Sequence, residues 1–140
     1  MSKIKCSYIG DLKCEAKHLQ SGKQIKTDAP LDHCGKGENF SPTDLLATSL
    51  GSCLLTIMSI KARSNGWELS NIYLDIEKIM TKNGERKIEQ LIINIYVLEN
   101  LSKEKFNFIK NASEDCPVTR NLSESLYIQI NWHYQKTFQT

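Results

Sequence analysis

Alternating apolar and polar residues predict β-strands in the first part of the chain, because successive side chains of a strand point to opposite faces. Two such segments flank Gly10 and predict a hairpin, and a third, shorter segment starts at the turn Ser21-Gly22. These segments would form an antiparallel N-terminal sheet, and they cover residues 3–9, 11–18 and 22–30.

A second set of strands is predicted in the middle and near the end of the chain. The sequence Lys82-Asn83-Gly84-Glu85 separates two long alternating segments, which is typical of a hairpin turn. One further alternating segment follows much later. The three segments cover residues 69–80, 87–99 and 126–134.

Between the two sets of strands, the pattern changes to that of a long apolar helix. Ser41 suits the N-cap, Pro42 suits the first helical position because it lacks an N–H, and Asp44 favours the positive end of the dipole. Apolar residues then cover most of the circumference until Lys61, and Gly66 ends the helix. We expect this helix to be buried on most sides, by sheets or by a partner subunit.

A second helical region precedes the last strand. Residues 101–115 predict an amphipathic helix with Ser102 as its cap, and Pro117 can open a second short helix over residues 118–125. The predicted order is β-β-β-α-β-β-α-α-β, an α+β fold whose antiparallel sheets wrap around the long central helix. A single chain of 140 residues covers such a helix incompletely, so a dimer is expected.

Composition fits one domain that spans residues 1–140, since hydrophobic residues make up 40% and charged residues 24% of the chain. The formal net charge is +2 with Lys and Arg scattered along the chain, which argues against nucleic acid or an anionic membrane as partner. We find no signal peptide and no uninterrupted apolar run of roughly 20 residues. We therefore expect a cytoplasmic protein.

The chain contains five cysteines, an odd number that argues against a framework of structural disulfides in the absence of a secretion signal. Reduced thiols are expected instead. Disulfides of cytosolic proteins are usually transient and catalytic, so a pair of cysteines with positional meaning indicates redox chemistry. The candidates are Cys6, Cys14, Cys34, Cys53 and Cys116.

Two of these cysteines have informative positions. Cys53 lies on the inward face of the central helix, about three turns from its start, where the dipole has little effect on its pKa, and it reads equally well as a small core residue. If Pro117 is the first helical residue, Cys116 lies near an N-cap whose N–H groups stabilise a thiolate. The alternative for Cys116 is a chance cysteine at a cap.

Other chemistries have less support. Cys6, Cys14 and Cys34 do not form the closely spaced ligand pairs of a zinc site, so neither a metal nor another cofactor is expected. A Cys-His hydrolase would pair Cys53 with one of the histidines, but no local signature supports it. The glycines before the central helix lack the spacing of a phosphate-binding loop.

The run GKGENFSPTDLLATSLGSCLLTIMSI, followed by EDCPVTRNL, resembles the OsmC/Ohr family of osmotically inducible and organic hydroperoxide resistance proteins. The similarity pairs a cysteine on the apolar helix with a second cysteine in a Cys-Pro-Val element. The opening YIGDLKCEAKH is similar to the OsmC-like subgroup, and the predicted order of elements agrees over nearly the whole chain.

The resemblance implies an intertwined homodimer with active sites at the interface. It also implies an antioxidant enzyme that acts under oxidative stress. It implies that Cys53 attacks an organic hydroperoxide, or hydrogen peroxide, to give a sulfenic acid, and that Cys116 condenses with it to form a disulfide. An external dithiol or a thioredoxin-like reductant would then restore both thiols by exchange.

The sequence departs from the family at two positions. Efficient members use an Arg of the N-terminal sheet and a Glu at the start of the central helix, where this chain has Lys13 and Thr43. Glu38 and Arg120 are candidates for a substitute pair, although each also fits a solvated surface charge. The departures keep open a second hypothesis, an OsmC-like protein that binds a small molecule or acts in stress without catalysis.

Overall fold

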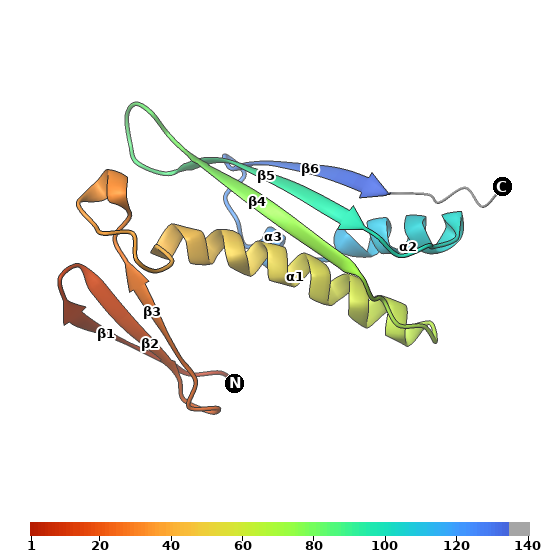
Figure 1. Ribbon diagram of the computed structural model, residues 1–140, viewed down its shortest axis with the longest axis horizontal. Coiled ribbons are helices and arrows are strands. Elements are labelled where there is room, and N and C mark those ends of the chain that lie inside the picture. Colours follow the sequence, from red (N-terminus) through yellow and green to blue (C-terminus); the bar gives the residue numbers. More distant parts are fainter. Residues whose placement is uncertain (135–140) are drawn as a thin grey trace. The chain divides into compact units, whose positions relative to one another are not determined.

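The computed structural model describes residues 1–134, which fold into two compact units, Met1–Leu46 and the chain from Ala47 onward. The order of helices and strands, labelled in Figure 1, is the predicted one, so the α+β prediction is confirmed. An additional short 3-10 helix at Leu31–His33 was not predicted. That residues 1–140 act as a single domain stays a prediction.

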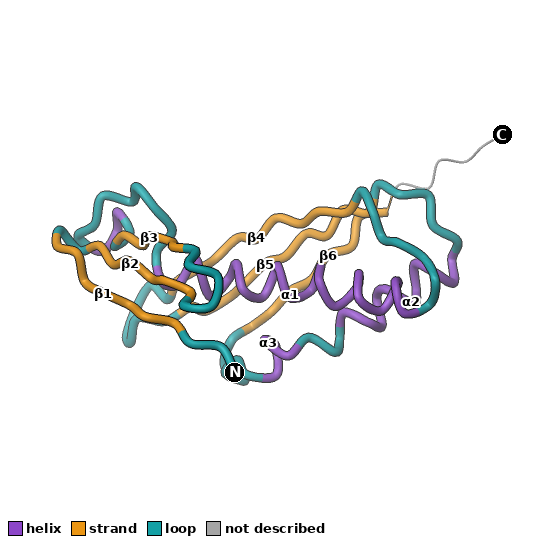
Figure 2. Tube along the Cα trace, turned by 90° about the horizontal axis from the view of Figure 1, so that it is seen from below, coloured by secondary structure: helices purple, strands orange, loops and turns teal. Residues whose placement is uncertain are grey.

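The first unit contains a three-stranded antiparallel sheet of β1 (Ile4–Gly10), β2 (Lys13–His18) and β3 (Gln24–Asp28). Figure 2 shows these three strands beside one another in the order of the sequence. Gly10 enters the first turn with a φ of 92°, a conformation that favours glycine. The register places Lys13 of β2 directly opposite Asp28 of β3.

Helix α1 covers Pro42–Ser64 and begins as its sequence predicts. Ser41 Oγ accepts a hydrogen bond from the Asp44 N–H at 3.1 Å, and the Asp44 carboxylate accepts one from the Ser41 N–H at 2.8 Å. Two backbone donors at the helix start are satisfied reciprocally, as in a capping box. The start of α1 is therefore fixed by local sequence.

The second unit is built on a sheet of β4 (Ile72–Met80), β5 (Ile88–Val97) and β6 (Tyr127–Tyr134). Figure 1 shows α1 running along one face of this sheet. A Cβ on Gly51 of α1 would come within 2.6 Å of the Ile76 side chain, so the absence of a side chain there allows the helix to approach β4 closely. The residues of α1 that belong to this core are Ala47, Leu50, Leu54 and Met58.

One pairing differs from the expected antiparallel sheets, because β6 runs parallel to β5. Parallel neighbours need a long crossover connection, which α2 (Lys103–Ser113) and α3 (Pro117–Arg120) provide here. Ser102 caps α2 as predicted, and its side chain accepts from the Lys105 N–H at 3.2 Å. The second short helix is only four residues long and ends well before the predicted residue 125.

The side of α1 opposite the sheet is less covered than the sequence suggests. Ile60 is 52% exposed, and only about one face of the helix is buried within the chain. By length and composition α1 is apolar enough to cross a membrane, contrary to the expectation that the chain has no apolar run of that length. Core helices of water-soluble proteins pass the same test. That sheets and a partner subunit together bury most sides of α1 stays a prediction.

Candidate active site

Cys53 and Cys116 lie next to each other in the second unit, with their Sγ atoms 2.8 Å apart and joined by a hydrogen bond. Their positions come from two independent elements. Cys53 projects from the middle of α1, and Cys116 is the N-cap of α3, held there by the turn after α2. They are 63 positions apart in the sequence, so no local pattern indicates this distance.

Cys116 is fully buried, with 0% of its surface exposed, yet its surroundings favour the thiolate. Burial opposes ionisation, but the Cys53 thiol, the Thr119 hydroxyl and the N–H groups of Thr119 and Val118 donate toward Cys116 Sγ. Together these donors lower the pKa of Cys116 below the usual 9.0. Pro117 occupies the first position of α3, so Cys116 is the N-cap of that helix.

Cys53 has the opposite tendency. Burial raises its pKa above the usual 9.0, and the hydrogen bond and the charge of Cys116 raise it further, whereas the Val118 N–H lowers it. In the neutral dithiol, Cys116 donates to Cys53. The surroundings of the pair therefore favour a negative charge on Cys116 over one on Cys53.

A cavity of about 350 Å³ lies over Cys53, between α1 and the start of α3. It exposes mainly carbon atoms, with a few hydroxyl groups along α1. Cys53 is partly exposed, so a small molecule in this cavity reaches its sulfur, while Cys116 lies behind it. The described residues that line the cavity are Ser49, Ser52, Cys53, Thr56, Ile57, Ile60, Pro117 and Val118.

Lys13 and Glu38, two predicted supporting charges, meet in the first unit. Lys13 Nζ binds Asp28 Oδ2 at 2.7 Å and Glu38 Oε2 at 3.0 Å, and the Glu38 N–H donates to Asp28 at 2.9 Å. The hydrogen bond to Asp28, followed by that to Glu38, raises the pKa of Lys13. Asp28 is 1% exposed and was not singled out from the sequence.

Arg120, the third candidate charge, binds Asp115 at 3.1 Å on the other side of Cys116. The second oxygen of Asp115 binds Lys61 of α1 at 3.2 Å, so one carboxylate connects α1 to α3. Glu38 and Arg120 therefore do not pair with each other as suggested, since Glu38 binds Lys13 and Arg120 binds Asp115. Roles for Lys13, Glu38 and Arg120 in catalysis stay predictions.

Comparison with known proteins agrees with this geometry. Residues 35–131 match the family described as OsmC-like protein. The chain belongs to the OsmC-like family. No curated protein sequence matches it significantly.

Solved structures extend the OsmC-like match over nearly the whole chain. A Psychrobacter arcticus protein described as an osmotic stress induced and detoxification response protein is 39% identical, with a TM-score of 0.87, covering 95% of this chain and 96% of that one. The organic hydroperoxide resistance protein OsmC of Legionella pneumophila is 13% identical, with a TM-score of 0.74 and coverages of 95% and 96%. OhrB of Bacillus subtilis is 17% identical, with a TM-score of 0.66 and coverages of 94% and 97%.

The other three cysteines of this OsmC-like chain lie in the first unit and are free thiols. Cys6 is exposed on β1, Cys14 is half-buried on β2, and Cys34 follows the 3-10 helix with a φ of 66°. Among residues 1–134, no group of His, Cys, Asp and Glu has the arrangement of a metal site. The sulfur chemistry of the described chain therefore concentrates on Cys53 and Cys116.

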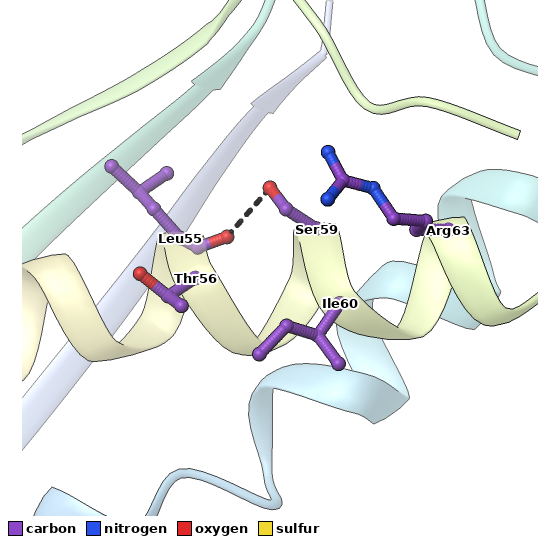
Figure 3. A pocket seen from close by; sticks show the side chains of 5 residues that line it. All are labelled: Leu55, Thr56, Ser59, Ile60 and Arg63. Carbon is purple, nitrogen blue, oxygen red and sulfur yellow. Dashed lines mark hydrogen bonds between the residues drawn. The ribbon is translucent and has the colours of Figure 1, made fainter.

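A second cavity, of about 300 Å³, lies on the adjacent face of α1 and shares Thr56 and Ile60 with the first (Figure 3). The Ser59 hydroxyl, which lines this cavity, donates a hydrogen bond to the Leu55 carbonyl at 2.9 Å. Arg63 lines it but forms two hydrogen bonds with Glu68, at 2.9 and 3.2 Å. This cavity contains no cysteine, and its charge is already paired.

Sequence reasoning missed Thr119, whose hydroxyl reaches the Cys116 sulfur. A signal for it exists. Cys116 is the N-cap and Thr119 is three residues later, the spacing at which a polar side chain reaches back to the cap in a capping box. No comparable signal marks Asp28, whose partner Lys13 is 15 residues away across the sheet.

Proposed function

We propose that this OsmC-like protein is a thiol-dependent peroxidase that reduces organic hydroperoxides through Cys53 and Cys116. The observation that carries the proposal is the sulfur–sulfur distance of 2.8 Å. A disulfide bond needs about 2.05 Å, so closure requires a shift of less than an ångström. Relatives named for organic hydroperoxide resistance support the same chemistry.

The cycle begins at Cys53, because that sulfur borders the cavity while Cys116 is buried. Cys53 sulfur attacks the terminal oxygen of the hydroperoxide, the O–O bond breaks, and the alkoxide leaves as an alcohol after gaining a proton. The product is a sulfenic acid on Cys53. Cys116 sulfur then attacks the Cys53 sulfur, and hydroxide leaves as water, which completes the disulfide.

The same geometry supports a proposal for the substrate and the reductant. A mainly apolar cavity favours a hydroperoxide with a hydrocarbon group over hydrogen peroxide, since burial of apolar surface contributes to binding. A dithiol or a thioredoxin-like protein would attack the disulfide at Cys53, the sulfur nearer the surface, and restore both thiols by exchange.

A homodimer is part of the proposal. The outer face of α1 carries residues of both cavities, and Ile60 on this face is 52% exposed. A second copy packed there would bury apolar surface and close the cavity over Cys53. Sedimentation equilibrium of the purified protein tests this, and a monomer at micromolar concentration would contradict it.

The decisive experiment follows disulfide formation by mass spectrometry. A variant with Cys6, Cys14 and Cys34 all replaced by Ser retains only the proposed pair, so every thiol signal is assigned. We expect one equivalent of cumene hydroperoxide to convert the reduced variant to a Cys53–Cys116 disulfide, with loss of two thiols and formation of one cumyl alcohol.

Two controls separate catalysis from simple binding. Introducing Cys53→Ser into this variant should leave the hydroperoxide unreduced, because the attacking sulfur is gone. If the parent variant binds cumene hydroperoxide but retains both thiols, the protein is a non-catalytic binder of the OsmC-like family, the second hypothesis that the departures at Lys13 and Thr43 suggest.

A further inference from the structure

The first step of the proposed reaction requires Cys53 to lose a proton, and its own surroundings do not favour that loss. Burial and the neighbouring sulfur raise its pKa. Among the described residues that line its cavity, Cys53 is the only one that ionises. The lining therefore offers no cation to stabilise a Cys53 thiolate.

The neighbouring sulfur has the properties of a base. Cys116 Sγ is 2.8 Å from Cys53 Sγ, within the reach required for direct proton transfer. Its charge is stabilised by Cys53, by Thr119 and by the N–H groups of Thr119 and Val118. All these donors are neutral, so the charge on Cys116 is stabilised without an ion pair that would hold it permanently.

The charged groups around this pair balance one another. Asp115 precedes Cys116 on the turn from α2, Lys61 comes from α1 and Arg120 from α3. Both basic side chains bind the Asp115 carboxylate, at 3.2 and 3.1 Å. No charged side chain is among the main influences on the pKa of either thiol.

We infer that Cys116 is the catalytic base of the first step, in addition to its later attack on the sulfenic acid. The inference rests on the proposed peroxidase function and adds a second role for this residue. Thr119 is then a positioning residue, because its hydroxyl acts on the substrate only through the sulfur of Cys116.

The proton and electron balance needs no reactant besides the hydroperoxide and water. The Cys116 thiolate takes the proton of Cys53 as the Cys53 sulfur bonds to the terminal oxygen of the hydroperoxide and the O–O bond breaks. The leaving alkoxide takes a proton from water at the open cavity, because Cys116 is buried behind Cys53. The Cys116 sulfur then attacks the Cys53 sulfenic acid, and its proton leaves with the displaced hydroxide as water.

The test measures the rate of Cys53 sulfenic acid formation, trapped with dimedone, in the variant that lacks Cys6, Cys14 and Cys34. Adding Cys116→Ser removes the base while changing side-chain volume little. We expect the rate at pH 7 to fall about 100-fold or more, the usual contribution of a general base. Raising the pH should recover the rate, because solvent then deprotonates Cys53.

A resolving thiol with no role in the first step predicts the opposite result. The charge on Cys116 raises the pKa of Cys53, so its removal would leave the rate unchanged or increase it. A Cys116→Ser rate within about threefold of the parent, less than the smallest general-base effect, overturns the inference while leaving the peroxidase intact. Absence of any sulfenic acid or disulfide in the parent removes the peroxidase proposal itself.

Thr119 provides an independent measurement. Thr119→Val removes the hydroxyl but keeps the shape, so the pKa of Cys116 should rise, and the pH at which sulfenic acid formation becomes fast should rise with it. Ultraviolet absorbance of the thiolate reports the same shift without peroxide. Thr119→Ser keeps the hydroxyl and should restore both profiles, whereas identical profiles for all three proteins would contradict the inference.

Discussion

Asp28 and Cys116 are two buried groups that form anions, and the two units of the chain stabilise them differently. Asp28 in the first unit is 1% exposed and binds the ammonium group of Lys13 at 2.7 Å. Cys116 in the second unit is 0% exposed, and only neutral donors act on it. A cation fixes the charge of the first group, and neutral donors leave the second free to exchange a proton.

This difference indicates what each group can do. An anion held by a cation contributes to stability, because its protonation would leave the cation without a partner. An anion held by hydroxyl, thiol and N–H donors can gain or lose a proton at small cost, since those donors remain hydrogen-bonded to a neutral sulfur. Reversible ionisation is a requirement for acid–base chemistry.

Removing either active-site sulfur should have the largest effect on activity. Cys53→Ser and Cys116→Ser should each reduce reductant-dependent turnover by on the order of 1000-fold, because both sulfur atoms form bonds in the proposed cycle. Under reducing conditions, urea denaturation should show that both variants stay folded, with a loss in the free energy of unfolding of at most about 3 kcal/mol, the cost of a buried hydroxyl without a partner. Strong turnover in both variants would contradict the assignment of the reaction to the two sulfur atoms, and with it the contrast between Cys116 and Asp28.

Asp28→Asn should have the largest effect on stability among these changes. An amide accepts a weaker hydrogen bond from Lys13 and introduces N–H donors that need acceptors in a buried place. We expect thermal unfolding to shift down by several degrees. Asp11→Asn is the matched control, since Asp11 also binds a lysine, Lys36 at 2.7 Å, but both side chains are exposed; an equal shift in both variants would contradict our reading of Asp28.

The pH dependence of stability should show the same carboxylate. The hydrogen bond from Lys13, and then that from the Glu38 N–H, lower the pKa of Asp28 below its usual 3.8. Its contribution is therefore fully present above that value and is lost as the pH falls through the lower pKa of the folded state. Urea denaturation between neutral and strongly acidic pH should show a loss that is smaller in Asp28→Asn.

The smallest expected effect is that of Asp11→Asn on its own. Exposed ion pairs contribute between nothing and about 1 kcal/mol, so thermal unfolding should be nearly unchanged in moderate salt. A clear loss of stability would show that the Lys36–Asp11 pair stabilises the first unit to a similar extent as the Lys13–Asp28 pair.

The order of elements could be predicted because the signals are local. The alternation that marks β4 and β5 repeats every two residues. The caps Ser41 and Ser102 each accept a hydrogen bond from the N–H three residues later. The parallel pairing of β6 could not be predicted, because it depends on where α2 and α3 return the chain. Local patterns determine elements, whereas pairing depends on the whole topology.

The candidate site divides in the same way. The position of Cys116 at an N-cap was readable from Pro117. The contact with Cys53 was implied by the family resemblance alone, because it depends on the packing of α1 against the turn before α3, which no local pattern reports. The partners of Lys13 were equally hidden, since Asp28 comes beside it only when β2 and β3 pair.

The separation of 63 residues between Cys53 and Cys116 has a consequence for the lifetime of the protein. A disulfide between them would close a loop of nearly half the chain, and the lost freedom of the unfolded state stabilises the folded one by about 4 kcal/mol. The oxidised form would unfold far less often than the reduced form, and proteases act on unfolded chains. Exposure to peroxide would thus protect the protein from degradation until a reductant opens the loop again.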